Sequence, residues 1–230
     1  MNLTDDGILL IDKPAGWTSF DVVAKIRGAR RAVLKGEGVT PTKKQLRVGH
    51  AGTLDPFATG LLVVLLGAAT KRSDEFLKQD KTYEATMTLG AVSSTGDPEG
   101  ELTPVGDAKP SLDEIQAAVA SFVGTITQTP PAYSAIKING QRAYKLARKG
   151  QEVDIPTRQV TVHSLEVTGY TYPEVRIRAH VSSGTYIRSL VQDIGAQLAV
   201  GAYCSQLRRT VIGELSIDQA VGVEAITSID

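Results

Sequence analysis

The chain has 230 residues, of which 42% are hydrophobic and 22% are charged, and its formal net charge is zero. This composition is typical of a folded globular protein and excludes a disordered or fibrous chain. The longest apolar stretch, residues 60–69, is too short to span a bilayer, and the first residues lack the basic and apolar regions of a signal peptide. We therefore expect a cytoplasmic protein with a single domain over residues 1–230.

The cysteine and histidine content indicates neither a disulfide nor a metal site. Cys204 is the single cysteine, which excludes an internal disulfide and a zinc cluster built on thiolates. The three histidines are not spaced as metal ligands usually are, and the glycine-rich motifs that bind nucleotide phosphates are missing. The sequence thus predicts no metal and no cofactor.

Hydrophobic periodicity and capping residues predict the secondary structure in chain order. The expected elements are a strand at 8–11, a helix from 19 to about 30, a mobile loop over 28–47, strands at 61–66 and 83–89, a helix from a capping box at 111–114 to about 122, a short basic helix at 141–149, strands at 160–167 and 175–181, a helix at 186–198 and a last strand near 210–217. Strands and helices follow each other without a regular strand–helix–strand repeat. This mixture predicts an α+β fold with a largely antiparallel mixed sheet decorated by helices and loops.

The run Gly-His-Ala-Gly-Thr-Leu-Asp-Pro-Phe-Ala-Thr-Gly at 49–60 brings an imidazole, a hydroxyl and a carboxylate together between glycines. Glycines let the backbone approach a ligand closely or adopt positive φ, so the run is typical of a functional site beside a buried strand. A second interpretation is that Asp55 caps a short helix that begins at Pro56. The spacing alone leaves both interpretations open.

Positive charge is concentrated in two segments although the whole chain is neutral. Residues 25–47 hold eight basic residues and one acidic residue, and residues 137–149 hold five basic residues and no acidic one. Such segments are often ordinary solvated surface, but they also suit the phosphates of a nucleic acid. RNA binding is therefore one of two hypotheses for both segments.

The run at 49–60, extended by Leu61 and Leu62, resembles the signature of the TruB family of tRNA pseudouridine synthases. Four further parts of the sequence match family motifs in the family order: residues 13–19, 81–84, 128–137, and 184–188 together with 207–209. The resemblance covers nearly the whole chain, from about residue 8 to about residue 213. It implies a bent mixed sheet with the catalytic cleft along its middle, and the isomerisation of uridine to pseudouridine at position 55 of the tRNA T loop without any cofactor.

The resemblance also implies roles for particular residues. Asp55 matches the nucleophile that attacks either the uracil or the ribose, and Arg188 matches the arginine that pairs with it. Tyr83 matches the aromatic residue that stacks on the flipped-out uracil and is a candidate base for the last proton. Five further positions match substrate-binding residues. His50 fills the place that the uracil vacates, Tyr186 and Leu207 line the pocket, and Lys13 shapes the floor of the cleft. Lys137 contacts RNA from the thumb-like segment (residues 128–150).

Two departures from the family pattern concern RNA binding. Residues 29–47 form a basic insertion, and the sequence ends without the C-terminal PUA domain of familiar members. We therefore expect a monomer that acts on the T arm of tRNA without a guide RNA or an obligate protein partner. Two alternatives are the same reaction on another RNA, and a binding module that refolds tRNA without turnover.

Overall fold

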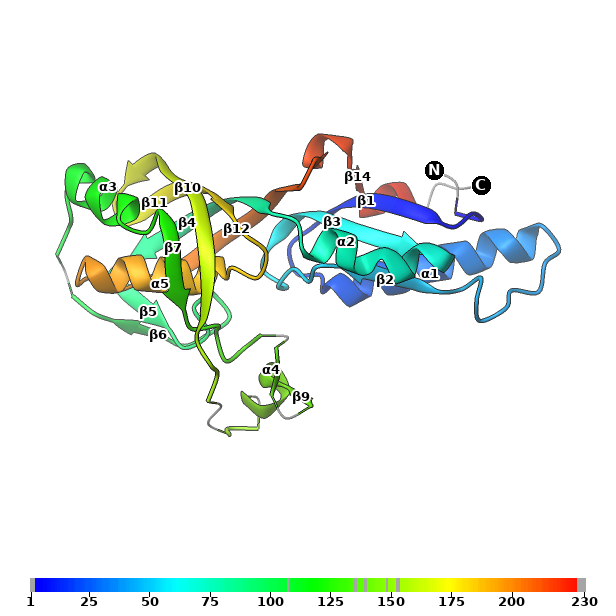
Figure 1. Ribbon diagram of the computed structural model, residues 1–230, viewed down its shortest axis with the longest axis horizontal. Coiled ribbons are helices and arrows are strands. Elements are labelled where there is room, and N and C mark those ends of the chain that lie inside the picture. The colour runs from blue at the N-terminus through cyan, green and yellow to red at the C-terminus, as the bar shows by residue number, and fades with distance from the viewer. Residues whose placement is uncertain are drawn as a thin grey trace. The chain divides into compact units, whose positions relative to one another are not determined.

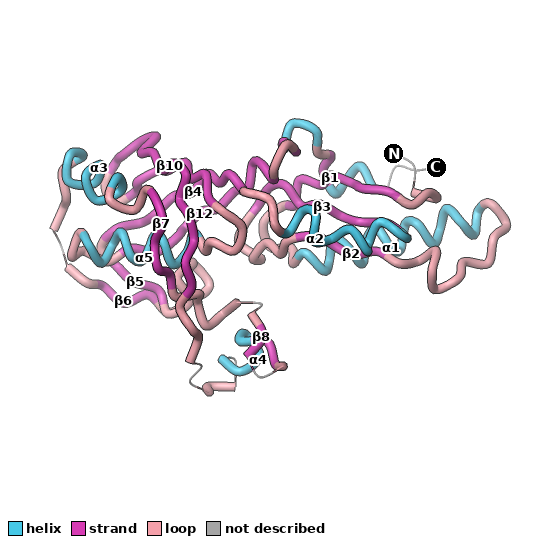
Figure 2. Tube along the Cα trace, in the orientation of Figure 1, coloured by secondary structure: helices cyan, strands magenta, loops and turns pink. Residues whose placement is uncertain are grey.

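The computed structural model describes residues 3–106, 108–134, 136–138, 140–147, 149–151 and 154–226. The chain divides into two compact units, which we call unit 1 (Met1–Lys81 with Arg208–Asp230) and unit 2 (Thr82–Leu207). It passes from unit 1 into unit 2 within strand β4 and returns within strand β12 (Figures 1 and 2). The expected single domain remains a prediction, because two compact units can belong to one folding domain.

Unit 1 is built around strand β3. Its elements are β1 (Gly7–Lys13), α1 (Ser19–Gly36), β2 (Val48–Ala51), β3 (Thr59–Leu66), a 3-10 helix (Gly67–Arg72), α2 (Ser73–Leu77), β13 (Leu215–Ser216), a 3-10 helix (Ile217–Gln219), β14 (Val221–Gly222) and a last 3-10 helix (Val223–Ile226). Strand β1 pairs with β3 along its length, from Gly7 opposite Leu66 to Lys13 opposite Gly60. The other edge of β3 pairs with β2 at one end and with β12 (Ala202–Ile212) at the other. With neighbours on both edges, β3 is buried, and Leu61, Val63 and Leu65 pack against Ala51 and Ile212.

Unit 2 contains a sheet with the strand order β12–β4–β11–β10–β7. Its elements are β4 (Lys81–Leu89), β5 (Ala91–Ser93), β6 (Leu102–Pro104), α3 (Leu112–Ala120), β7 (Gly124–Gln128), β8 (Lys137–Ile138), β9 (Gln141–Arg142), α4 (Ala143–Ala147), β10 (Arg158–Thr171), β11 (Glu174–Val181) and α5 (Ile187–Gln197). Helix α5 comes very close to the start of β12, because a Cβ atom on Gly195 would lie 2.3 Å from the backbone nitrogen of Ala202. Glycine at position 195 therefore permits this packing.

Most of the predicted elements are confirmed, including the α+β class and the largely antiparallel sheet. The predicted mobile loop over 28–47 is wrong in its first part, because α1 continues to Gly36. The reason is Arg30, which is 1% exposed and donates hydrogen bonds to the backbone oxygens of Thr4, Asp5 and Gln45. These contacts with distant residues tie the second half of the helix to the unit.

Two other boundaries differ from the prediction. The strand expected near 210–217 is β12 followed by β13, and β12 begins at Ala202, eight residues before the expected start. The predicted basic helix at 141–149 is shorter, because residues 141–142 pair with β8 as strand β9 and the helix covers Ala143–Ala147. Arg148, which belongs to that prediction, lies outside the described residues. None of the helices in the described part of the chain combines the length and the apolar character that crossing a membrane requires.

Candidate active site

Asp55 lies in a seven-residue loop, residues 52–58, that joins the antiparallel strands β2 and β3; we call it the Asp55 loop. The loop contains no helix, so the interpretation of Asp55 as the cap of a helix starting at Pro56 is wrong. The backbone oxygen of Asp55 accepts a hydrogen bond from the amide of Ala58 at 3.2 Å, which closes a turn. The Asp55 residue is half-buried. A carboxylate is thus presented at the end of a buried strand by a loop without regular structure.

The residues on either side of Asp55 are fixed to the first motif of the chain. The hydroxyl of Ser19, which is 1% exposed, accepts a hydrogen bond from the amide of Leu54 at 2.9 Å and donates one to its carbonyl at 3.2 Å. The carbonyl of Pro56 accepts from the amide of Gly16 at 2.9 Å and from the ammonium of Lys13 at 3.3 Å. The main chains of both residues next to Asp55 are therefore held, which restricts how the carboxylate can move.

Lys13 holds this arrangement from inside the unit, because it is completely buried. Its ammonium also donates to the carbonyls of Pro14 at 2.9 Å and Trp17 at 2.7 Å. A buried cation is costly unless hydrogen bonds compensate it, and three carbonyl oxygens provide that compensation here. The position of Lys13 agrees with the predicted role in shaping the floor, although the contact with RNA that a substrate-binding residue requires stays a prediction.

Arg209 holds the first residue of the Asp55 loop and the strand that follows the loop. This arginine is 2% exposed; its Nη2 donates to the carbonyl of Gly52 at 2.9 Å and its Nε to the carbonyl of Leu61 at 2.8 Å. Gly60 has φ of +102°, and a Cβ atom there would lie 2.3 Å from the backbone oxygen of Arg209. Glycine is required at position 60 because both the positive φ and the close approach of β12 exclude a side chain.

Lys81, at the start of β4, is a further buried cation of unit 1. Its ammonium donates to the carbonyls of Phe76 at 3.1 Å, Leu77 at 2.7 Å and Gln79, at the end of α2. Burial and the neighbouring positive charge of Arg209 lower the pKa of Lys81 to about 8, although Asp80 opposes this effect. Lys81 thus connects the end of α2 to the strand that carries Tyr83.

Arg188 is the second residue of α5 and is 2% exposed, so it is not a surface arginine. Its Nη1 donates to the carbonyl of Thr95 at 2.8 Å and to Oδ2 of Asp97 at 2.9 Å, and its Nη2 donates to the carbonyl of Tyr133 at 2.7 Å. The predicted pairing of Arg188 with Asp55 stays a prediction. What unit 2 contains is a buried ion pair between Arg188 and Asp97.

Asp97 lies outside the segments that match the family motifs. Its Oδ1 accepts hydrogen bonds from the hydroxyl of Thr95 at 2.5 Å and from the amide of Glu99 at 3.0 Å. Its carbonyl accepts from the hydroxyl of Ser93 at 2.6 Å. The Ser-Ser-Thr-Gly-Asp turn at 93–97 is the one signal in the sequence, since hydroxyl residues two and four before an aspartate commonly bond to it.

Tyr186 immediately precedes α5 and is fixed through its main chain. Its amide donates to Oε1 of Gln128 at 2.8 Å and its carbonyl accepts from Nε2 of the same side chain at 3.0 Å. The guanidinium carbon of Arg158 lies 4.9 Å from the centroid of the tyrosine ring, a cation–π contact. The residue is half-buried.

The remaining predicted site residues lie on strands. Tyr83 is in β4 and Leu207 is in β12, the neighbouring strand of the sheet, and they are 9% and 8% exposed. His50 is in β2, opposite Val64, two residues before the Asp55 loop. The backbone of Lys137 forms β8 and pairs with Arg142, while its side chain lies outside what the structure describes.

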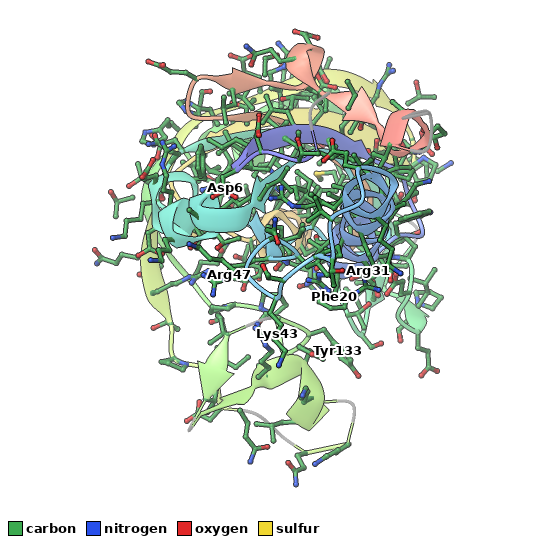
Figure 3. The ribbon with its side chains drawn as sticks, turned by 90° about the vertical axis from the view of Figure 1, so that its right-hand side faces the viewer. Asp6, Phe20, Arg31, Lys43, Arg47 and Tyr133 are labelled. Atoms are coloured by element: carbon green, nitrogen blue, oxygen red, sulfur yellow. The ribbon has the colours of Figure 1, made fainter. Side chains whose placement is uncertain are left out.

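The basic insertion (residues 29–47) is part helix and part exposed connection. Lys43, Lys44 and Arg47 are exposed in the segment between α1 and β2. Figure 3 shows Arg31, Lys43 and Arg47 on the lower side of unit 1, and Asp6 above them.

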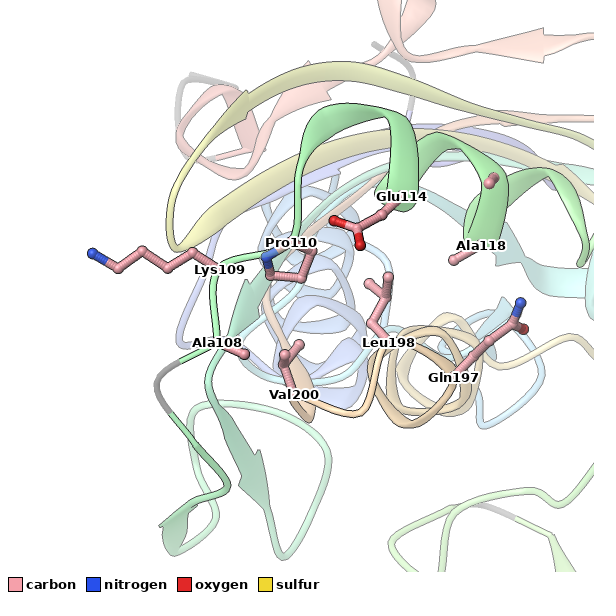
Figure 4. Close-up of a pocket in the computed structure, with 9 residues that line it drawn as sticks. Ala108, Lys109, Pro110, Glu114, Ala118, Gln197, Leu198 and Val200 are labelled. Atoms are coloured by element: carbon pink, nitrogen blue, oxygen red, sulfur yellow. The ribbon is translucent and has the colours of Figure 1, made fainter.

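A cavity of about 470 Å³ in unit 2 is separate from Arg188 (Figure 4). It is lined by Ala108, Lys109, Pro110, Glu114, Ala117, Ala118, Gln197, Leu198 and Val200. Gln197 is nine residues after Arg188 on the same helix, a separation of about 13 Å along the helix axis. None of the predicted site residues lines this cavity.

Comparison with known proteins identifies the family. Residues 40–187 match the model described as "TruB family pseudouridylate synthase (N terminal domain)". The chain is 43% identical over 238 aligned positions to the tRNA pseudouridine synthase B of Thermobifida fusca, covering 97% of this chain and 75% of that protein. It is 44% identical over 220 positions to the tRNA pseudouridine synthase B of Parabacteroides distasonis, covering 95% of this chain and 91% of that protein.

Solved structures agree with this result. A chain in the crystal structure of a Cbf5–Nop10–Gar1 complex is 31% identical with a TM-score of 0.68 over 96% of this chain. A chain in the structure of an H/ACA RNP bound to a substrate RNA is 30% identical with a TM-score of 0.65 over 95% of this chain. This chain spans about half the length of each of them, 53% and 51%. Because the family model covers well over half of the chain and relatives match along nearly all of it, the chain belongs to the TruB family of pseudouridylate synthases.

Proposed function

We propose that this protein is an isomerase that converts uridine to pseudouridine in tRNA, at position 55 of the T loop. The observation that carries the proposal is Asp55, which stands in the family motif and between two residues, Leu54 and Pro56, whose main chains are held by hydrogen bonds. The names of the relatives from T. fusca and P. distasonis support the reaction and the class of RNA. The T loop as the target rests on the motif resemblance.

The reaction breaks the bond between N1 of uracil and C1′ of ribose, turns the base and rejoins it through C5. All atoms of the substrate are retained, so the protein must supply a nucleophile and proton transfers. A carboxylate can attack either C1′ or C6 of the uracil, and we assign this role to Asp55. Holding Leu54 and Pro56 keeps the carboxylate in one orientation, which lowers the entropic cost of reaching the transition state.

Other residues of the motifs handle the base, which must leave its stack to be reached. We assign stacking on the flipped uracil to Tyr83 and pocket contacts to Tyr186 and Leu207. His50 takes the place that the uracil vacates. Arg188 is proposed to pair with Asp55 during the reaction and to contact the phosphate of the target nucleotide, in an orientation that Asp97 and two carbonyl groups fix.

The thumb-like segment (residues 128–150) is proposed to bind the T arm. Among its described parts are the β8–β9 pair and α4, which carry Arg142, Tyr144 and Lys145. We also propose that the protein works as a cytoplasmic monomer, without a guide RNA or a partner protein. The solved Cbf5 chains were determined in complexes with other proteins, whereas the relatives named tRNA pseudouridine synthase B support action on tRNA.

The experiment that tests the proposal is incubation of the protein with an unmodified tRNA transcript, followed by mapping of pseudouridine at each uridine. The wild-type protein should modify the T loop. Asp55→Asn keeps the shape of the side chain and removes the nucleophile, so turnover should disappear while tRNA still binds. Asp74→Asn, an exposed aspartate on α2, is the matched control and should retain full activity.

Each alternative predicts a different result. Activity of the Asp55→Asn variant within tenfold of wild type would show that the nucleophile assignment is wrong. Refolding of tRNA by the wild-type protein without pseudouridine formation would favour the tRNA-folding chaperone. Modification of another RNA with none in tRNA would favour the same reaction on a different substrate.

A further inference from the structure

An exposed aromatic ring stands on the first turn of α1, outside the family motifs. Phe20 is 62% exposed, although α1 buries a complete apolar face elsewhere. Single exposed apolar residues are common and by themselves indicate nothing. Phe20 differs because the guanidinium carbon of Arg27 lies 5.8 Å from its ring centroid, and Nη2 of Arg27 is itself held by the carbonyl of Val48 at 3.1 Å. The ring therefore rests on an anchored cation.

A second pair of the same kind lies beside it. The ammonium of Lys25 lies 5.6 Å from the ring centroid of Trp17, the residue just before the cap of α1. Two aromatic rings, each with its own cation, thus occur at one end of one helix. Aromatic rings next to cations are the combination that binds stacked bases and their phosphates together.

Cations continue along the exposed side of α1. Residues that follow each other at helical spacing from Phe20 form what we call the α1 stripe: Phe20, Ala24, Arg27, Gly28, Arg31 and Lys35. The stripe holds no acidic residue. The small residues Ala24 and Gly28 leave room for a polynucleotide to approach the helix. At 1.5 Å per residue the stripe is about 22 Å long. Figure 3 shows Phe20 and Arg31 on the same side of unit 1.

The α1 stripe begins next to the Asp55 loop in the structure, although the two are distant in the sequence. Ser19, the residue before Phe20, makes both hydrogen bonds to the main chain of Leu54, and Leu54 precedes Asp55. A polynucleotide whose target nucleotide reaches Asp55 can extend from it across the surface of unit 1. The exposed ring of Phe20 follows directly after Ser19, the residue that contacts the loop.

We propose that the α1 stripe is an RNA-binding surface for the part of the substrate next to the target nucleotide. A base stacks on Phe20, and the phosphates that follow lie along Arg31 and Lys35. This inference rests on the proposed action on tRNA and adds a contact surface outside the recognised motifs. An RNA fits this surface better than an acidic protein does, because aromatic rings and regularly spaced cations occur together. The exposed apolar area of the stripe is a single ring, which is small for a protein interface.

Binding measurements test the proposal. All proteins carry Asp55→Asn so that the RNA stays unmodified, and fluorescence anisotropy gives the Kd for an unmodified tRNA transcript over a range of salt concentrations. Loss of one base–aromatic contact should raise the Kd about 5- to 150-fold in Phe20→Ala and in Phe20→Leu, whereas Phe20→Tyr, which keeps the ring, should stay within about twofold of the parent protein. Phe20→Leu retains an apolar side chain, so it decides the outcome if Phe20→Ala impairs folding.

The cations are tested by their salt dependence. Arg31→Ala with Lys35→Ala removes two phosphate contacts and should reduce the slope of log Kd against log salt by about 1.4 to 1.8. The matched control, Lys71→Ala with Lys78→Ala, removes two exposed lysines on either side of α2 and should leave the slope unchanged. Equal slopes in the two double variants, or Phe20→Leu binding as tightly as Phe20→Tyr, would show that the stripe is solvated surface or serves another class of partner.

Failure of this inference differs from failure of the proposed function. If the wild-type protein modifies tRNA and these variants bind it normally, the α1 stripe is not a binding surface and the enzyme assignment stands. If the protein without substitutions neither binds nor modifies tRNA, the proposed function itself is wrong, and the α1 stripe loses its proposed ligand.

Discussion

Replacing Asp97 by asparagine should destabilise the protein far more than an exposed acid would, because it removes one partner of a buried ion pair. Arg188 and Asp97 have side-chain exposures of 3% and 6%, and their closest atoms are 2.9 Å apart. The substitution changes neither size nor shape. It leaves the guanidinium of Arg188 buried with the two carbonyls of Thr95 and Tyr133 as its acceptors.

The expected magnitude follows from the hydrogen bonds on both oxygens of Asp97. One oxygen accepts from Arg188, and the other accepts from the hydroxyl of Thr95 and the amide of Glu99. The asparagine amide must turn its NH2 group toward one of these sets, so at least one buried donor loses its acceptor. Together with the loss of charge pairing, this should cost about 3–5 kcal/mol in the free energy of unfolding.

Urea unfolding followed by circular dichroism measures this cost. The set comprises Asp97→Asn, Arg188→Met and the double variant, in which neither buried charge remains. The double variant should be more stable than the sum of the single effects predicts, by about 1–3 kcal/mol. Glu84→Gln is the control, because the Glu84–Arg178 pair is about half exposed and should contribute at most about 1 kcal/mol.

Activity separates positioning from stability. Asp97→Asn should lower kcat for pseudouridine formation under conditions where the variant is fully folded, since Arg188 loses the contact that orients it. An Asp97→Asn variant that loses less than about 1 kcal/mol and shows additive behaviour with Arg188→Met would refute the reasoning about the buried pair.

Three further predictions concern separate parts of the molecule. Tyr83→Phe keeps the ring and deletes the hydroxyl. If that hydroxyl transfers the last proton, turnover should fall as far as in Tyr83→Leu while the affinity for tRNA is unchanged. Near-normal turnover in Tyr83→Phe would leave stacking as the one role of Tyr83. Neutralising Lys43, Lys44 and Arg47 together should weaken tRNA binding and flatten its salt dependence, and an unchanged slope would indicate ordinary solvated surface. Because the pKa of Lys81 is lowered to about 8 from 10.5, the unfolded chain binds more protons between these values and the free energy of unfolding should rise with pH there; urea titrations should show the rise in the wild-type protein and its loss in Lys81→Met.

The sequence predicted those parts of the fold that depend on neighbouring residues. The apolar run of β3 and the capping box of α3 are local patterns, and both elements formed as expected. The length of α1 depended instead on Arg30, whose acceptors, Thr4, Asp5 and Gln45, are distant in the sequence. Nothing local distinguishes this arginine from the exposed arginine that follows it.

The same distinction applies to the candidate site. Asp55 was found because its whole motif is contiguous in the sequence. Ser19, Arg209 and Asp97 were not recognised as residues that orient the site, since each acts on a partner 35 to 157 positions away. Arg209 belonged to a recognised motif, but its contact with the carbonyls at 52 and 61 could not be foreseen from residue types, because those acceptors are main-chain atoms present at every position.

That use of main-chain acceptors has a consequence for how the protein can evolve. Lys13 and Arg209 hold the Asp55 loop by its carbonyl oxygens at positions 52 and 56 and the following strand by the carbonyl oxygen at position 61, and every amino acid supplies such an oxygen. The two donor side chains therefore cannot be replaced by other residue types. At the acceptor positions, by contrast, only backbone angles and packing limit which residues are tolerated. In a saturation library, positions 13 and 209 should tolerate almost no substitution, while Leu61 should accept other apolar residues with the loop geometry intact.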